Sequence, residues 1–178
     1  MVAESRLQPG RVPLLEAGYR GQVPQEAEAV WRFFGVEVCS RAVLEVATPR
    51  ARRLCRVLGA RAVTLGRVVY FREPLRLDAK GQAFLVHELT HVVQWGTRWW
   101  QRVGFLLRYL VGLLPFAFRG LVGWLRGRPC NGETGWGRFL CLMHEEAYRC
   151  PGGHWAECQA VEQERAFLKW LDGRTRGG

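Results

Sequence analysis

The stretch Phe84–Gln94 reads FLVHELTHVVQ, and within it His87, Glu88 and His91 form the pattern HExxH. On an α-helix, side chains four positions apart project from one face about one turn apart, so the two imidazoles can converge on a single small cation. The glutamate beside the first histidine can reach a water molecule bound there, as in zinc hydrolases. The spacing therefore predicts a Zn²⁺ site with Glu88 as the general base.

The residues around this pattern favour a buried helix. No Pro or Gly interrupts the segment 82–95, and its flanking positions Phe84, Leu85, Val86, Leu89, Val92 and Val93 are apolar. We expect the helix to begin after Asp78, a good N-cap, and to end before Gly96. The alternative interpretation is a core helix whose two histidines are only hydrogen-bonded.

The order of segments predicts an α+β fold: a small β-sheet, then the HExxH helix, then packed C-terminal helices, a minimal zincin-like arrangement. Short β-branched runs predict strands at 36–39 and 43–47, and two short strands or one bent strand at 62–71. The segment 68–71 is expected to be either an edge strand that holds an extended peptide or an ordinary core strand. Further helices are expected at 50–58, 140–149 and 155–172.

Domain organisation follows from the same reading. Residues 1–24 carry three prolines and three glycines without a sustained period and predict a loosely ordered leader. Residues 25–172 are expected to form one metallopeptidase-like domain that contains an apolar helical insertion at 99–126. A frayed tail is expected at 173–178.

The apolar insertion leaves three interpretations open. It can be a core helix or helical hairpin, a segment in contact with the membrane interface, or a true span with snorkelled arginines. Its uninterrupted apolar run between Arg108 and Arg119 is 10 residues, about half of what a bilayer core requires. Pro115 is expected to break it into two helices.

Net charge and cysteine content bear on the possible partners and on the cellular compartment. The net charge is +10, with Arg supplying nearly all of the basic residues; scattered arginines on solvated faces account for this, and a nucleic-acid partner is not expected. No secretory signal is recognised, so we expect a cytoplasmic or peripheral membrane location with reduced thiols. In an oxidising compartment, four of the six cysteines are close enough in sequence to pair: Cys130, Cys141, Cys150 and Cys158.

A catalytic zinc site needs a third protein ligand besides His87 and His91. The longer pattern HExxHxxGxxH is excluded, because Gln94 and Thr97 stand where it requires Gly and His. The remaining candidates are His144, His154, Glu145, Glu146, Glu157, Glu162 and Glu164.

Several segments together resemble the bacterial domain of unknown function 4157. They are 62–71 (AVTLGRVVYF), 87–94 (HELTHVVQ), 105–109 (FLLRY) and 144–148 (HEEAY). The resemblance spans about residues 60 to 160 and implies a gluzincin-like zinc metallopeptidase linked to contractile injection systems. The family's closing segment, Pro-Phe-Glu-x-Glu-Ala, corresponds to WAECQA at 155–160, although the proline is missing and Gln159 replaces a second acid.

This resemblance implies that Glu157 is the third zinc ligand and that Ala160 lets the helices approach. Tyr148 and Tyr109 are then candidate donors to the oxyanion. The expected function is hydrolysis of a peptide or protein substrate by a metal-activated water. Two alternatives remain: a non-catalytic, zinc-stabilised docking module associated with secretion, and a basic protein that binds a membrane surface, with peripheral contact through residues 99–126.

Overall fold

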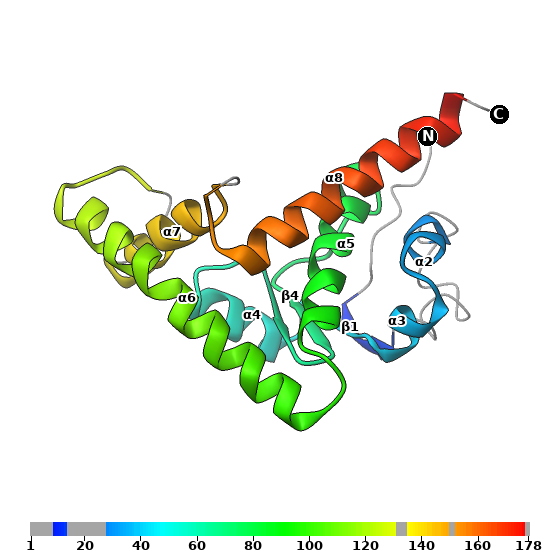
Figure 1. The fold of residues 1–178 in the computed structure, drawn as a ribbon, viewed down its shortest axis with the longest axis horizontal. Helices are drawn as coiled ribbons and strands as arrows, with labels where there is room; N and C mark the ends of the chain where they lie inside the picture. The colour runs from blue at the N-terminus through cyan, green and yellow to red at the C-terminus, as the bar shows by residue number, and fades with distance from the viewer. Residues whose placement is uncertain (1–8, 14–27, 131–134, 150–151, 177–178) are drawn as a thin grey trace.

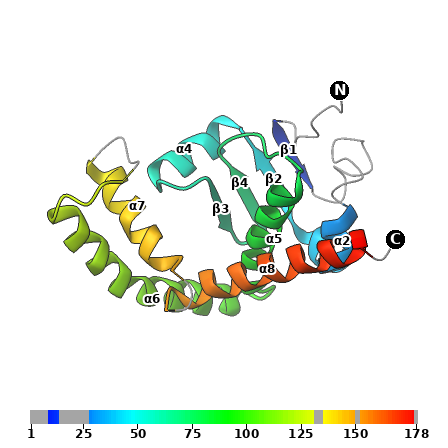
Figure 2. The same cartoon turned by 90° about the horizontal axis from the view of Figure 1, so that it is seen from above.

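A four-stranded β-sheet lies at the centre of the protein, as the computed structural model shows (Figures 1 and 2). The structure describes residues 9–13, 28–130, 135–149 and 152–176. The strands are β1 (Gly10–Pro13), β2 (Val43–Val46), β3 (Ala62–Leu65) and β4 (Val68–Phe71), in the spatial order β1-β2-β4-β3. The pair β2–β4 is parallel, whereas β1–β2 and β3–β4 are antiparallel. The predicted α+β class is confirmed.

Seven helices accompany the sheet in the described part of the chain. They are α2 (Glu28–Phe34), α3 (Val36–Arg41), α4 (Pro49–Val57), α5 (Ala79–Gln94), α6 (Trp99–Leu125), α7 (Gly135–Ala147) and α8 (Trp155–Arg176). Helix α5 begins as predicted, because the Asp78 side chain accepts a hydrogen bond from the Gly81 N–H at 2.8 Å. It ends before Gly96, whose φ of 66° reverses the chain.

The segment Val36–Cys39, predicted as a strand, is instead part of α3. Gly35, with a φ of 81°, turns the chain between α2 and α3. Strand β1 pairs with β2 along the edge opposite β4. β1 lies within the stretch 1–24, which was expected to be a loosely ordered leader. Residues 1–8 and 14–24 of that stretch lie outside the described residues.

The edge-strand assignment also changes. Strand β4 lies between β2 and β3, so the expectation that Val68–Phe71 is an edge was wrong, and the alternative of an internal strand is confirmed. A tight turn at Gly66, with a φ of 62°, folds β3 back along β4 and makes β3 the edge. β3 also contacts α5, which places the sheet edge beside the HExxH motif.

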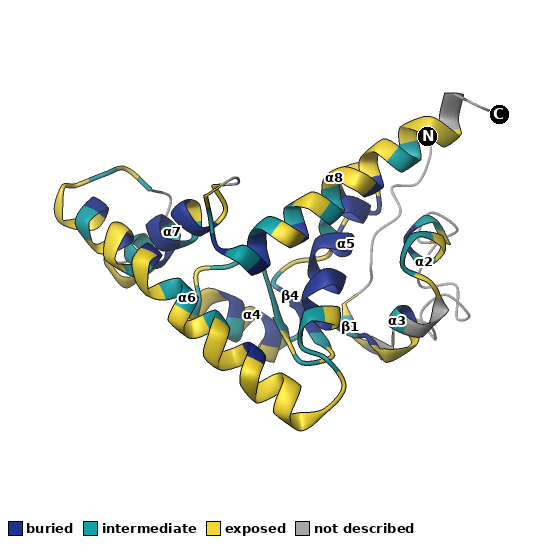
Figure 3. Ribbon diagram, in the orientation of Figure 1, coloured by how far each residue is buried: buried dark blue, intermediate teal, exposed yellow. Residues whose placement is uncertain are grey.

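The main hydrophobic core lies between the sheet, α5 and α8. Side chains from all three layers meet there, among them Phe71 from β4, Leu85 and Leu89 from α5, and Phe167 from α8, each at most 1% exposed. Figure 3 shows α5 as buried along most of its length. Because α5 is enclosed by the sheet on one side and α8 on the other, its polar side chains must find their partners inside the protein.

Helices α6 and α7 form a hairpin that projects from this core (Figure 2). The expectation that Pro115 divides the segment 99–126 was wrong: α6 is one helix of 27 residues. Packing on α7 continues past the proline, because Phe116 joins Leu140 and Met143 in a small second core. Gly120 permits this approach, since a Cβ there would lie 2.9 Å from the Met143 backbone nitrogen.

A disulfide between Cys130 and Cys141 fastens the α6–α7 connection to α7. The expectation of fully reduced thiols is thereby corrected, and two of the four cysteines expected to pair under oxidising conditions are joined to each other. Cys39 and Cys55 are free and buried. At the other end of the chain, α8 continues to Arg176, beyond the predicted end at Asp172 and into the expected frayed tail; residues 177–178 lie outside the described residues.

Candidate metal centre

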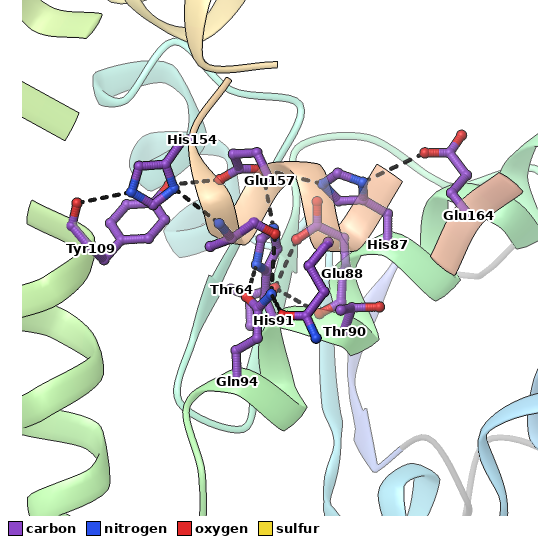
Figure 4. Close-up of polar contacts among 12 residues, drawn as sticks. Thr64, His87, Glu88, Thr90, His91, Gln94, Tyr109, His154, Glu157 and Glu164 are labelled. Carbon is purple, nitrogen blue, oxygen red and sulfur yellow. Dashed lines mark hydrogen bonds and ion pairs between the residues drawn. The ribbon is translucent and has the colours of Figure 1, made fainter. Parts of the chain in front are cut away.

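Helices α5 and α8 bring together the two histidines and Glu157 (Figure 4). The Nε2 atoms of His87 and His91 lie 3.4 Å and 3.3 Å from Glu157 Oε2. One ligand atom from each of the three side chains lies within 4.8 Å of the other two, and the residues are only 2%, 8% and 4% exposed. This buried group can hold a metal ion.

The second nitrogen of each imidazole faces another side chain. His91 Nδ1 lies 2.8 Å from Gln94 Oε1, and His87 Nδ1 lies 3.5 Å from Glu164 Oε2. Because both partners are acceptors, each Nδ1 carries the proton and each Nε2 presents its lone pair when the ring is neutral. Both lone pairs therefore face Glu157, which is the orientation that metal ligation requires.

Unsatisfied polar atoms test whether the site fits a metal. Both ring nitrogens of His87 and Glu157 Oε2 are buried and form no hydrogen bond of normal geometry. Buried polar atoms are rarely left unpaired, because desolvation without a partner is costly. Two nitrogen donors and one carboxylate match the protein ligands of a catalytic zinc site. The residues thus fit Zn²⁺, whereas the structure leaves the identity of the metal open.

The contacts between carboxylates and imidazoles also set the protonation of the metal-free site. Burial alone lowers the pKa of His87, but its contacts with the Glu157 and Glu164 carboxylates outweigh this and raise that pKa to about 9. Burial raises the pKa of Glu157, but its close contacts with His87 and His91 outweigh this and hold that pKa well below its usual value. In the absence of metal, protons therefore occupy the place that a cation would take.

Glu88 is buried on the same helix and is bound by the edge strand. The hydroxyl of Thr64 in β3 donates to Glu88 Oε2 at 2.7 Å, and the indole of Trp95 donates to the Thr64 carbonyl at 3.2 Å. These contacts fix the carboxylate and leave Oε1 as the oxygen that can accept a proton.

The two tyrosines considered from the sequence occupy different positions. Tyr109 in α6 donates its hydroxyl to Glu157 Oε1 at 2.7 Å; burial, followed by the nearby Glu157 charge, raises the pKa of this phenol, which therefore stays protonated. The Tyr148 ring, just after α7, stacks on the His87 ring with centroids 5.5 Å apart.

A cavity of about 290 Å³ opens beside these groups. Glu88, His91 and Glu157 line it together with both tyrosines, all four residues of β3 and the α6 residues Phe105, Leu106, Leu110 and Leu113. His144 also lines it, and burial lowers the pKa of that imidazole. The site is therefore a hollow with the candidate ligands His91 and Glu157 on one wall and a sheet edge on another.

The other candidate ligands have different partners. Glu146 pairs with Arg128 at 2.8 Å, and Glu145 lies 3.7 Å from the same arginine. His154 accepts from the Ala156 N–H and contacts the Tyr109 carbonyl, so it caps α8 and joins it to α6. Glu162 is exposed. Glu164 faces Nδ1 of His87, whereas Glu157 faces Nε2 of the same ring.

Sequence reasoning did not assign the residues that orient the histidines. Gln94 follows His91 by three positions, so a helix places it against that ring. Its amide nitrogen donates to the Ala156 carbonyl and to Gln159 Oε1, which links α5 to α8. Glu164 follows Glu157 by seven positions, two helical turns on the same face. Both spacings are visible in the sequence once the α5–α8 pair is known.

Comparison with protein families gives one match. Residues 28–98 match the family model of the eCIS core domain, a range that covers fewer than half of the 178 residues and includes His87, Glu88 and His91 but ends before Glu157. The match supports an association with bacterial extracellular contractile injection systems. It thereby supports the association with contractile injection systems that the resemblance implied. Neither curated proteins nor solved structures gave a match.

Proposed function

We propose that this protein is a zinc-dependent metallopeptidase that acts in association with a contractile injection system. The observation that supports it most is the convergence of His87 Nε2, His91 Nε2 and Glu157 Oε2 in a buried group. Two segments far apart in the chain supply these atoms, Gln94 bonds the second nitrogen of His91, and Glu164 faces that of His87 at 3.5 Å. A helix that merely buried two histidines would not need this arrangement.

The substrate suggested by the surroundings is an extended peptide. Among the described strands, β3 has a neighbour, β4, on one side, so its other edge can pair with an added strand except at the Thr64 carbonyl, which already accepts from the Trp95 indole. All four of its residues line the cavity that contains Glu88 and Glu157. A peptide paired there would carry a backbone carbonyl past the metal ligands.

In this proposal each residue has a defined task. A bound zinc ion would polarise the scissile carbonyl and make water acidic enough to attack near neutral pH. Glu88 Oε1 takes a proton from the attacking water and passes it to the leaving amine, so that the peptide bond and one water become a carboxylic acid and an amine. Thr64 holds the other carboxylate oxygen of Glu88, and Tyr109 holds Glu157 through Oε1. Tyr148 is a candidate donor to the oxyanion, placed at the cavity wall.

A second candidate function is a non-catalytic, zinc-stabilised module that docks or is delivered within the injection system. The family match favours it, because it concerns association with the apparatus and covers only two of the three candidate ligands. In this case the metal would clamp α5 to α8, and Glu88 would serve its hydrogen bond to Thr64.

The Glu88→Gln variant separates the two functions. Zinc content and the hydrolysis of a fluorogenic peptide library are measured for wild type, for Glu88→Gln and for Glu162→Gln, which makes the same chemical change at an exposed position of α8. A peptidase should lose about 100- to 10,000-fold of its turnover in Glu88→Gln while it retains zinc, and Glu162→Gln should behave as wild type. Undiminished turnover in Glu88→Gln would reject the peptidase, and zinc-loaded wild type without turnover would favour the docking module.

A further inference from the structure

Helix α6 exposes a continuous band of large apolar side chains, the apolar stripe. Its members are between 40% and 71% exposed. They are Trp99, Trp100, Val103, Leu106, Leu107, Leu110, Val111, Leu114, Phe118, Leu121, Trp124 and Leu125. At 100° per residue they fall within one arc of about 140° that runs the whole length of the helix. Figure 3 shows this helix as largely exposed.

Helix α6 is long and apolar enough to cross a membrane, and only 17% of its most apolar window is buried inside the protein. An exposed apolar surface of this extent is unusual for a protein that contacts only water. The opposite face of α6 packs on α7 and presents Tyr109 to Glu157. No residue of the stripe belongs to a hydrophobic core of the described residues, although Leu106 and Leu110 also line the cavity beside the candidate metal centre.

The charge of this region selects among partners. The segment 89–132 contains six arginines and no Asp or Glu. On the helix, Arg108 and Arg119 border the stripe on one side and Arg102 borders it on the other. The guanidinium of Arg108 lies over the Trp155 ring at 4.2 Å, and that of Arg119 lies over Phe116 at 5.6 Å. The arginines are thus held at the borders of the stripe, beside the buried face.

This pattern fits an anionic lipid surface better than a second copy of the chain. Two copies that met through their stripes would bring two sets of arginines together without any acidic residue from α6 between them. An anionic bilayer instead offers phosphates at the level of the arginines and acyl chains at the level of the stripe. Tryptophans near both ends of the helix favour the same interface.

An orientation parallel to the membrane agrees with the positions of the arginines. A helix of 27 residues is about 40 Å long, and in a perpendicular span Arg108 and Arg119 would lie within the hydrocarbon, where arginine is costly. Lying in the interface, the helix keeps both at headgroup depth. The packed face of α6, with Tyr109, then remains on the water side, whereas the stripe residues Leu106 and Leu110 also line the cavity beside the candidate metal centre.

An apolar groove extends this surface onto α7. A hollow of about 500 Å³ is lined by residues of α6 and α7, and Phe118, Leu121 and Trp124 belong to both the hollow and the stripe. Its α7 wall includes Trp136, which is exposed, and Phe139. A groove with only apolar side chains that opens beside a lipid-facing helix can accept an acyl chain.

We propose that α6 docks the protein parallel to an anionic membrane surface, with the apolar stripe among the acyl chains and Arg102, Arg108 and Arg119 at the lipid phosphates. The proposal does not depend on metal binding or on peptide hydrolysis.

Flotation with lipid vesicles tests it directly. The zinc-loaded full-length protein is mixed with vesicles of phosphatidylcholine alone or with a third of phosphatidylglycerol, at low and high salt. Wild type should float with the anionic vesicles at least about tenfold more strongly than with the neutral ones, and salt should weaken this binding. Absence of binding to anionic vesicles, or equal binding to both kinds, would overturn the proposal.

Two double variants locate the surface. Leu107→Glu/Leu114→Glu places charges in the stripe and should lower binding at least about tenfold. Val57→Glu/Leu168→Glu makes the same change in charge at exposed apolar positions on α4 and α8 and should bind as wild type. Equal loss in both variants would contradict the assignment to α6. Circular dichroism and zinc content verify that each variant is folded.

A third variant keeps the test decisive if the stripe variant does not fold. Arg108→Gln/Arg119→Gln leaves the stripe intact and should reduce the preference for anionic over neutral vesicles. Retention of the full preference would contradict the role of the arginines. Two other outcomes overturn the proposal: vesicle-bound protein that resists alkaline carbonate extraction, which indicates a span, and a dimer abolished by Leu107→Glu/Leu114→Glu without any vesicle binding, which indicates a second copy.

Discussion

Helices α5 and α6 invert the usual relation between polarity and burial. α5 contains two histidines and a glutamate and is buried along most of its length, whereas α6 is more apolar and mostly exposed. The difference lies in the available partners. The polar groups of α5 are matched by Glu157, Gln94 and Thr64, while α6 has α7 as its principal packing partner, on one face. Composition indicates what a helix can bury, and the surrounding elements decide what it does bury.

The largest effect is expected at the group that lets α5 be both polar and buried. Glu157→Ala removes the carboxylate that faces both imidazoles, and zinc affinity should fall by more than about 100-fold, beyond what a change outside the direct ligands costs. Isothermal titration with zinc measures this, with Glu162→Ala as the exposed control on the same helix. Equal zinc affinity in both variants would show that Glu157 is not a ligand.

A pair of leucine truncations measures the contrast in burial itself. Leu89 in α5 is fully buried and Leu114 in α6 is 65% exposed. Leu89→Ala should lower the free energy of unfolding by about 2–5 kcal/mol, and Leu114→Ala should change it by less than about 0.5 kcal/mol. Urea denaturation of the zinc-free proteins gives both values. A large loss in Leu114→Ala would mean that the α6 stripe is covered in solution.

The packed face of α6 can be tested without touching its exposed face. Gly120→Ala forces a methyl group against the Met143 backbone and should cost about 1–3 kcal/mol. Gly104→Ala, in the same helix, meets no atom within 4 Å and should gain up to about 1 kcal/mol from helix propensity. Thermal unfolding compares the two. Zinc affinity should be unchanged in Gly104→Ala, and equal stability of both variants would exclude tight α6–α7 packing.

The buried charges of α5 predict a pH dependence with opposite signs for the two states of the site. In the metal-free protein the pKa of His87 rises from 6.5 to about 9, so its stabilising contribution is complete below pH 6.5 and is lost as the pH rises through 9. Zinc must displace this proton and that of His91, whose pKa is also raised, so its affinity should increase by at least about tenfold per pH unit across the same range. Melting temperatures with a chelator and with zinc should diverge as the pH rises. Parallel curves would contradict proton–metal competition at His87.

The smallest effect is expected at the side chain that orients His91. Gln94→Leu removes the acceptor at Nδ1 and the link to α8, and zinc affinity should fall about tenfold. Gln159→Leu removes only one acceptor of the Gln94 amide and should have less effect. A Gln94 variant that binds zinc as tightly as wild type would show that packing alone fixes the ring.

The sequence contained enough to predict α5, because its apolar flanks, its Asp78 cap and its Gly96 stop all agree. It predicted the class of the fold and the two histidines for the same reason: these features depend on spacing within one element. Glu157 came from resemblance, since a ligand on another helix has no local pattern to reveal it. The strand at Val36–Cys39 and the break at Pro115 were wrong because both were local preferences that neighbouring elements overrode.

The exposure of α6 was not decided by the sequence either. Its apolar residues fit a core helix equally well, and only the number of elements available to cover it settles the matter. The edge position of β3 likewise depends on strand order, which short β-branched segments do not encode.

The route of the chain between the two halves of the metal centre has a further consequence. His91 lies before the α6–α7 hairpin and Glu157 after it. A bound ion would therefore close the chain between these two residues into a loop. A peptide chain nicked once within α6 would then keep its two fragments joined through coordination as well as through the α5–α8 interface. Chelation would weaken that junction. The ion would thus act as a removable crosslink between the segments before and after the α6–α7 hairpin.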